Sequence, residues 1–164
     1  MYDFHLHSNH SMDSVTPMED MVLAAIDKNI KSICFTDHID LYFNSQKDDI
    51  LFDKPNYFQN IEIVKNKYAE KIEILSGVEI GLQPSSIDKG NEFMEGTSYD
   101  FVIMSAHTVN DMELHEELYY KDINSLGALE RYYNSIYTCI KEFNNYNVVG
   151  HLDYIDRYIP ETHG

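Results

Sequence analysis

The sequence predicts an α/β fold built around a mostly parallel sheet. Short runs rich in β-branched and aromatic residues alternate with stretches whose apolar residues follow helical spacing, the pattern typical of βα units. The 164 residues lie in the single-domain range and are few for a complete eightfold α/β barrel. No internal repeat, low-complexity tract or Pro/Gly-rich linker divides them, so residues 1–164 are expected to form a single domain.

The first half of the chain predicts three strands and two helices. The first strand covers residues 2–6, and the helix after it covers residues 17–29. Thr16 is expected to be the N-cap of this helix, with Pro17 at the first helical position and Glu19 completing a capping box.

A second strand is expected over residues 32–36. A polar connection, NSQKDDILFDKPN, follows without a strongly periodic element, and residues 56–71 predict a helix. The run KIEILSGVEI at 71–80 predicts the third strand.

The second half predicts two more strands around one long helix. The fourth strand is expected in SYDFVIMSAHTV at 98–109, the helix over residues 122–146, and the fifth strand in NVVGHLDYI at 147–155.

Composition restricts the partners that the chain can have. The net charge is −16, and an acidic surface repels both nucleic-acid phosphates and anionic membranes, although such a surface most often serves solubility alone. The start MYDFHLH lacks the features of a signal peptide, and no apolar run is long enough to span a membrane. Cys34 and Cys139 lie in apolar stretches without metal-site or disulfide spacing. A cytoplasmic protein with buried free thiols is expected.

Each predicted strand carries histidines or acids at its C-terminal end. In chain order they are His5 and His7, Asp37 and His38, Glu79, His107, and His151 with Asp153. A single histidine in such a position is more often structural than a ligand, but the C-terminal ends of parallel strands share one face, where sites are built. Five strands with the same feature favour a metal site. Imidazole and carboxylate ligands suit zinc, manganese or iron.

The first strand shows how these ligands are presented. Residues two apart in a strand project to the same side, so His5 and His7 share one face while Leu6 faces the other. Glu79 has two oxygens and can bridge two metals. Asp13, in the loop after the strand, is placed to fold back over the same face.

Six short motifs, in this order, resemble those of the polymerase and histidinol phosphatase (PHP) superfamily. They are HLH at 5–7, SMDS at 11–14, TDH at 36–38, GVE at 77–79, SAH at 105–107 and GHLD at 150–153. The resemblance covers the whole chain. Within the superfamily, the stretches FTDHIDLYF, GVEIGL and GHLDYIDRY are most similar to the monofunctional histidinol-phosphate phosphatases.

The resemblance implies a distorted (β/α)7 barrel, a TIM-like fold with two or three divalent metal ions (Zn, Mn or Fe) at the C-terminal ends of its strands. By position, the first metal would be held by His5, His7 and Glu79, the second by Asp13 and His38, and the third by Glu79, His107 and His151. In several members a histidine stands where Asp13 stands here. Asp13 is favoured as the substitute ligand, and His10 is the alternative.

The chain departs from the family pattern at its end. The family closes with an Asp-x-His pair on its last strand, whereas this sequence ends in RYIPETHG. About five of the seven strands are present, and the expectation is an incomplete barrel whose C-terminal part is absent. Unpaired strand edges invite association, so a homodimer is possible. At least one metal should be retained tightly and another weakly.

The activity implied by the resemblance is hydrolysis of a phosphomonoester. The substrate would be L-histidinol phosphate, cleaved in histidine biosynthesis to L-histidinol and phosphate by a metal-activated hydroxide. Glu79, His107 and Arg157 are the expected catalytic residues, and Arg157 would also bind the substrate phosphate. A surface arginine paired with an acid is an equal alternative for Arg157. Ser105 is a candidate substrate contact, although packing is the simpler interpretation.

Other functions remain open. A related phosphoesterase could act on nucleotides or phosphotyrosine, and a metal-binding domain with little activity is a third possibility. Asp153 is interpreted either as a residue that orients His151 or as a cap, and His115 as a solvent-facing residue.

Overall fold

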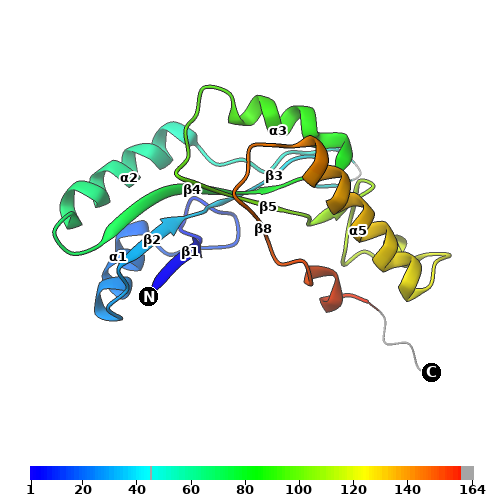
Figure 1. Cartoon of the computed structure of the whole chain (residues 1–164), viewed down its shortest axis with the longest axis horizontal. Helices are drawn as coiled ribbons and strands as arrows, with labels where there is room; N and C mark the ends of the chain where they lie inside the picture. Colours follow the sequence, from blue (N-terminus) through cyan, green and yellow to red (C-terminus); the bar gives the residue numbers. More distant parts are fainter. Residues whose placement is uncertain (45, 160–164) are drawn as a thin grey trace. The chain divides into compact units, whose positions relative to one another are not determined.

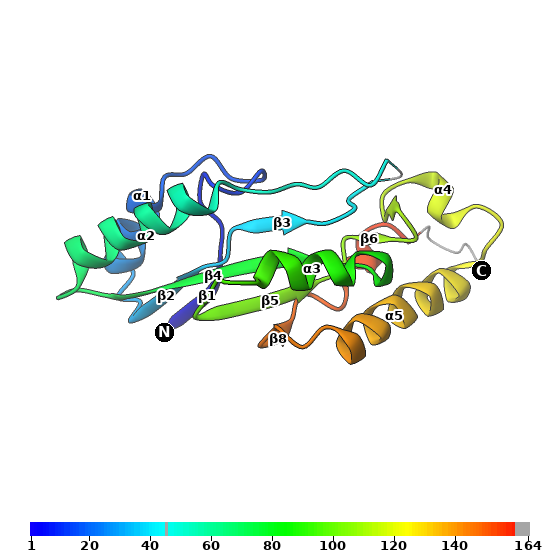
Figure 2. The ribbon, with the colours of Figure 1, turned by 90° about the horizontal axis from the view of Figure 1, so that it is seen from above.

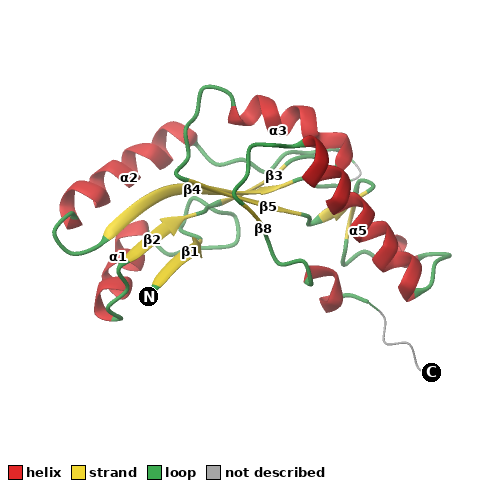
Figure 3. Ribbon diagram, viewed as in Figure 1, coloured by secondary structure: helices red, strands yellow, loops and turns green. Residues whose placement is uncertain are grey.

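The computed structural model describes residues 1–44 and 46–159 and contains the predicted parallel α/β sheet. The strand order is β1 (Tyr2–Leu6), β2 (Ser32–Phe35), β4 (Glu73–Gly81), β5 (Phe101–Ser105) and β8 (Val148–Val149). Strand β1 pairs in parallel with β2, and β2 with β4. The order of these five strands in the sheet is the same as their order in the sequence, as in a β/α barrel. Helices connect the strands along the chain (Figure 3).

The chain forms two compact units. The first consists of residues 1–39, 50–79 and 97–103, and the second of residues 40–49, 80–96 and 104 onward. Strands β4, β5 and the short β3 (His38–Asp40), which pairs with β4, each run from the first unit into the second. The single domain expected over residues 1–164 stays a prediction.

The first unit packs helices α1 (Met18–Asp27) and α2 (Lys54–Tyr68) beside its strands (Figure 1). The capping box predicted for α1 is wrong. Pro17 occupies the N-cap position, and the carboxylate of Glu19 bonds to the side chains of Lys67 and Tyr68 at the end of α2. A link between two helices therefore replaces the local cap, which no sequence pattern within α1 reveals.

Helix α2 is anchored by a side-chain cap and by one buried tyrosine. The carboxylate of Asp53 accepts from the backbone N–H of Asn56, and Pro55 lies in the first turn. The hydroxyl of Tyr57 lies 2.8 Å from the carbonyl oxygens of both Phe35 and Gly77. The N–H of Gly77 donates to the same hydroxyl at 2.9 Å. Tyr57 thus connects α2 to strands β2 and β4.

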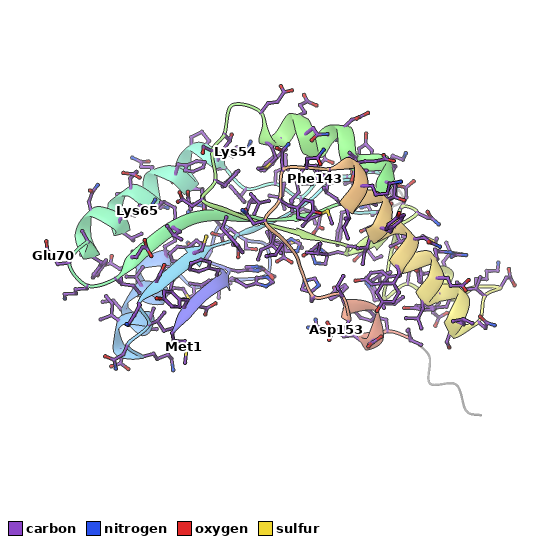
Figure 4. The ribbon with its side chains drawn as sticks, viewed as in Figure 1. Met1, Lys54, Lys65, Glu70, Phe143 and Asp153 are labelled. Carbon is purple, nitrogen blue, oxygen red and sulfur yellow. The ribbon has the colours of Figure 1, made fainter. Side chains whose placement is uncertain are left out.

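The second unit has a separate apolar core beneath helix α5 (Ser125–Glu142). This core consists of Ala106, Val109, Leu114, Tyr119, Ala128, Tyr132, Ile136 and Ile155. Figure 2 shows α5 with α4 (Glu117–Tyr120) and the hairpin of β6 (Thr108–Val109) and β7 (Met112–Glu113). Phe143, labelled in Figure 4, follows α5 and is fully buried.

Several boundaries differ from the sequence prediction. The predicted fourth strand ends at Ser105, because the chain then turns into the β6–β7 hairpin. The predicted fifth strand is only two residues long and is followed by a 3₁₀ turn, η2 (Tyr154–Arg157).

Further described elements were not predicted, namely β3, the 3₁₀ turn η1 (Pro84–Ser86), helix α3 (Ile87–Met94), β7 and α4. Among the helices that the structure describes, none is long and apolar enough to cross a membrane.

Candidate metal centre

Two histidines from the end of β1 converge on one carboxylate in the first unit. The Nε2 atoms of His5 and His7 lie 2.8 Å and 2.9 Å from the same oxygen, Oε2 of Glu79. Glu79 is on β4 and only 1% exposed, whereas the side chain of His5 is 41% exposed. The expected same-face projection of His5 and His7 is confirmed, and it directs both imidazoles toward a buried acid.

Asp13 contacts the other nitrogen of His7. Its Oδ2 lies 2.9 Å from Nδ1 of His7, and because a carboxylate only accepts, this nitrogen carries a proton. Burial alone would lower the pKa of His7, but the hydrogen bonds and charges of Glu79 and Asp13 outweigh it and raise the pKa to about 9. Burial would raise the pKa of Asp13, but Ser11 and His7 together lower it.

The donor set in this unit fits a divalent cation. His5, His7 and Glu79 each offer one ligand atom, and these three atoms lie within 4.8 Å of one another. Nε2 of His7 is buried and lies 2.9 Å from Oε2 of Glu79, the oxygen that it shares with His5. Two imidazole nitrogens and a carboxylate oxygen are ligands that zinc, manganese and iron accept. A cation at this point could be held by all three atoms.

Asp37 holds the loop that carries these ligands. It is fully buried, and its Oδ1 accepts from the backbone N–H of Ser8 at 2.6 Å, while the hydroxyl of Ser8 donates to Oδ2 at 2.8 Å. Burial raises the pKa of Asp37, against the opposing effect of these hydrogen bonds. Its position after β2 was predicted, whereas its role as a support for the residue after His7 was not.

Ser11 is a second support that sequence reasoning missed. Its hydroxyl donates to Asp13 at 2.5 Å and accepts from the backbone N–H of His38 at 3.1 Å. The ring of His38 lies 5.7 Å from that of His7. The only signal in the sequence was the density of serines in FHLHSNHSMDS.

His10, the alternative to Asp13, points to a different neighbour. Its Nε2 lies 2.9 Å from the side-chain nitrogen of Asn60 on α2, and its ring packs edge-on against Tyr57. Asp13, by contrast, contacts His7 directly. The geometry favours Asp13, and the ligand roles of both residues stay predictions.

The second unit contains a pair of neighbouring histidines. His107 follows β5 and His151 follows β8, and their Nε2 atoms are 3.3 Å apart. Two nitrogens bound to one tetrahedral zinc at about 2.0–2.1 Å lie about 3.3 Å apart, so the pair has the spacing of two ligands of one ion. The ring of Tyr154 packs against both, at 5.1 Å and 5.0 Å between centroids.

The remaining predicted site residues are also in the second unit. Arg157 is exposed, and its guanidinium lies over the ring of Tyr154 at 5.1 Å. Ser105 is 1% exposed, which favours a packing role. Asp153 is exposed at the N-cap position of η2, where its carbonyl accepts from Asp156. His115 is solvent-facing as predicted, and residues 160–164, with His163, lie outside the described residues.

A family model described as the PHP domain matches residues 3–162. The chain belongs to this family. A relative in Lactococcus lactis, a histidinol-phosphatase, is 36% identical over 162 residues. Another in Clostridium acetobutylicum, named as a probable histidinol-phosphatase, is 31% identical over 158 residues. These alignments cover 98% and 96% of this chain and 59% of each relative, so the chain spans about three fifths of their length.

A solved structure agrees with the fold. The crystal structure of histidinol phosphate phosphatase from Lactococcus lactis, complexed with zinc, L-histidinol and phosphate, has a TM-score of 0.89 and 35% identity. The match covers 98% of this chain and 61% of that one. A structure from Listeria monocytogenes, at 20% identity and a TM-score of 0.71, has the same fold. The predicted PHP-type α/β fold, with five of its parallel strands, is confirmed.

Proposed function

We propose that this chain is the metal-binding part of a phosphomonoester hydrolase that converts L-histidinol phosphate and water into L-histidinol and phosphate. The observation that carries the proposal is the 35% identity and TM-score of 0.89 to an enzyme crystallised with zinc, L-histidinol and phosphate. The two donor groups described above support it from the geometry.

The chain's own residues have distinct tasks in this proposal. His5, His7 and Glu79 would hold one divalent ion in the first unit, and His107 and His151 would each supply Nε2 to an ion in the second. When bound, such ions lower the pKa of a coordinated water and neutralise charge on phosphoryl oxygens.

The remaining groups would position the ligands or the substrate. Asp13 holds His7 through Nδ1, and Asp37 fixes the loop between them. Arg157, exposed and stacked on Tyr154, offers a planar fork for two phosphate oxygens.

A second candidate function is a metal-binding domain with little turnover. The observation that favours it is that the two donor groups could hold an ion without any substrate-binding residue.

Phosphate release from L-histidinol phosphate, p-nitrophenyl phosphate and a dinucleotide, each with added zinc or manganese, tests both candidates. Faster release from L-histidinol phosphate, lost in Glu79→Gln and kept in Glu73→Gln, supports the first. Glu73 is the matched control because it is an exposed glutamate on the same strand. Preference for either other substrate contradicts the assigned substrate. Retained metal without turnover on any of the three supports the second candidate.

A further inference from the structure

We propose that Asp40 is a positioning residue that fixes His107 in the tautomer with the proton on Nδ1, and that Gly81 provides the space for this contact. The Nε2 lone pair of His107 is thereby presented to a divalent cation. The inference rests on the proposed function, because it takes His107 as a metal ligand.

The contact between the two side chains is short and shielded from water. Oδ1 of Asp40 lies 2.9 Å from Nδ1 of His107, and the side chains are 3% and 8% exposed. A carboxylate has no proton to donate, so Nδ1 must donate and carry the proton. In neutral imidazole the other nitrogen then has the lone pair that a metal requires.

Gly81 is the residue that allows this arrangement. A Cβ built at position 81 would lie 1.6 Å from Oδ1 of Asp40 and 3.0 Å from Nδ1 of His107. A contact of 1.6 Å is impossible between non-bonded atoms, so any side chain at position 81 would displace the carboxylate from His107. Gly81, the second glycine of GVEIGL, therefore leaves the space in which Asp40 reaches His107. Strand pairing alone would not require a glycine there.

The other ring nitrogen of His107, Nε2, lies next to a second possible metal ligand. Nε2 of His107 faces Nε2 of His151 at 3.3 Å, and Tyr154 packs against both rings. With the proton of His107 on Nδ1, its Nε2 accepts from His151 when no metal is bound. For a cation to bind both Nε2 atoms, the proton of His151 would have to move from its Nε2 to its Nδ1, whereas His107 would need neither a proton shift nor a ring rotation.

The second unit thus repeats, in a buried form, an arrangement found in the first. Asp13 accepts from Nδ1 of His7 while Nε2 of His7 faces Glu79, but the side chain of Asp13 is 53% exposed. The 3% exposure of Asp40 makes its hydrogen bond the less screened of the two. Acids that orient a ligating histidine typically change metal affinity 10–100-fold when removed.

The test compares Asp40→Asn, Asp40→Ala and Gly81→Ala with His107→Gln and with Asp88→Asn in the 164-residue chain. Asp88→Asn is the matched control, since it removes one negative charge from an exposed position in the same unit. Zinc binding is measured by competition with a chelator, and the zinc lost in His107→Gln defines the site. The nitrogen shifts of His107 in the metal-free chain, assigned by their loss in His107→Gln, report the tautomer independently of activity.

The expected result is unprotonated Nε2 for His107 in the parent and a mixture of tautomers in Asp40→Ala and Gly81→Ala. Zinc affinity at this site should fall by about 10–100-fold in all three test variants and stay unchanged in Asp88→Asn. Protonated Nε2 in the parent overturns the inference, whether or not the variants fold. If folded Asp40 variants keep full zinc affinity while His107→Gln loses zinc, the inference is overturned and the proposed function stands. Unchanged zinc binding in His107→Gln removes the metal role of His107 from the proposed function, and the inference fails with it.

Discussion

Glu79 is the side chain on which the first donor group depends. Its Oε2 is shared by the Nε2 atoms of His5 and His7, and its burial on β4 leaves the carboxylate dependent on partners within the protein. A buried acid is stable only when it is paired or coordinates a metal. A neutral amide at this position has one oxygen instead of two and loses the charge that attracts a cation.

Glu79→Gln is therefore expected to weaken zinc retention by about tenfold or more. Elemental analysis after dialysis against metal-free buffer measures the bound zinc, with Glu73→Gln as the control. Equal zinc in the two variants would show that this carboxylate is not a ligand.

The neighbours of His7 allow a second test at the same scale. Asp13 contacts Nδ1 of His7, whereas His10 contacts Asn60 on α2. Asp13→Ala should lower zinc affinity by about 10–100-fold, because His7 loses the partner that orients it. His10→Ala should leave zinc affinity unchanged. Chelator competition distinguishes the two, and the reverse pattern would make His10 the loop ligand.

At the scale of elements, one tyrosine connects a helix to two strands. Tyr57 is fully buried, and its hydroxyl contacts backbone groups of β2 and β4. Burial raises the pKa of Tyr57 far above its ordinary value, so the hydroxyl keeps its proton. Gly77 lies at the centre of this junction, and a Cβ there would meet the Sγ of Cys34 at 2.6 Å.

Tyr57→Phe should lower the free energy of unfolding by about 1–3 kcal/mol, because the N–H of Gly77 and a strand carbonyl lose their partner in a buried place. Tyr137→Phe, at a tyrosine that is 60% exposed, should change it by less than about 0.5 kcal/mol. Urea titration of both variants measures the difference. Equal midpoints would mean that the hydroxyl contributes nothing to the junction.

For the whole molecule, the edge strands of the sheet determine whether the chain can associate with a second copy. In the described part of the chain, β1 and β8 are the outermost strands of the sheet path, and β8 has only two residues. The longer β1 has a neighbouring strand on one side only in the described part of the chain, and its residue Tyr2 is 67% exposed. Such an edge is a template for pairing with another chain, and a charged residue on it opposes that pairing.

The chain is therefore expected to form dimers in a concentration-dependent manner, and Tyr2→Lys should shift the equilibrium toward the monomer. Light scattering coupled to size-exclusion chromatography measures the mass at several concentrations. A monomer at every concentration would contradict the expected association.

Three structural details could not have been read from the sequence. The capping box at Thr16 failed because Glu19 found partners on α2, 48 and 49 residues away. Strand β3 was missed because a three-residue strand has no measurable period. The fifth strand was predicted too long, since Tyr154 and Ile155 form part of η2 and pack in the apolar core of the second unit instead of pairing.

The sequence by itself determined the α/β class, the order of the strands and the presence of histidines or acids at their C-terminal ends. These properties follow from local periodicity and from the alternation of side chains along a strand, which a linear sequence records. Only the tertiary structure decided which nitrogen of each histidine faces an acid. That choice depends on contacts such as Asp13 with His7 and Asp40 with His107, which join residues 6 and 67 positions apart. The order of residues along the chain does not specify such contacts.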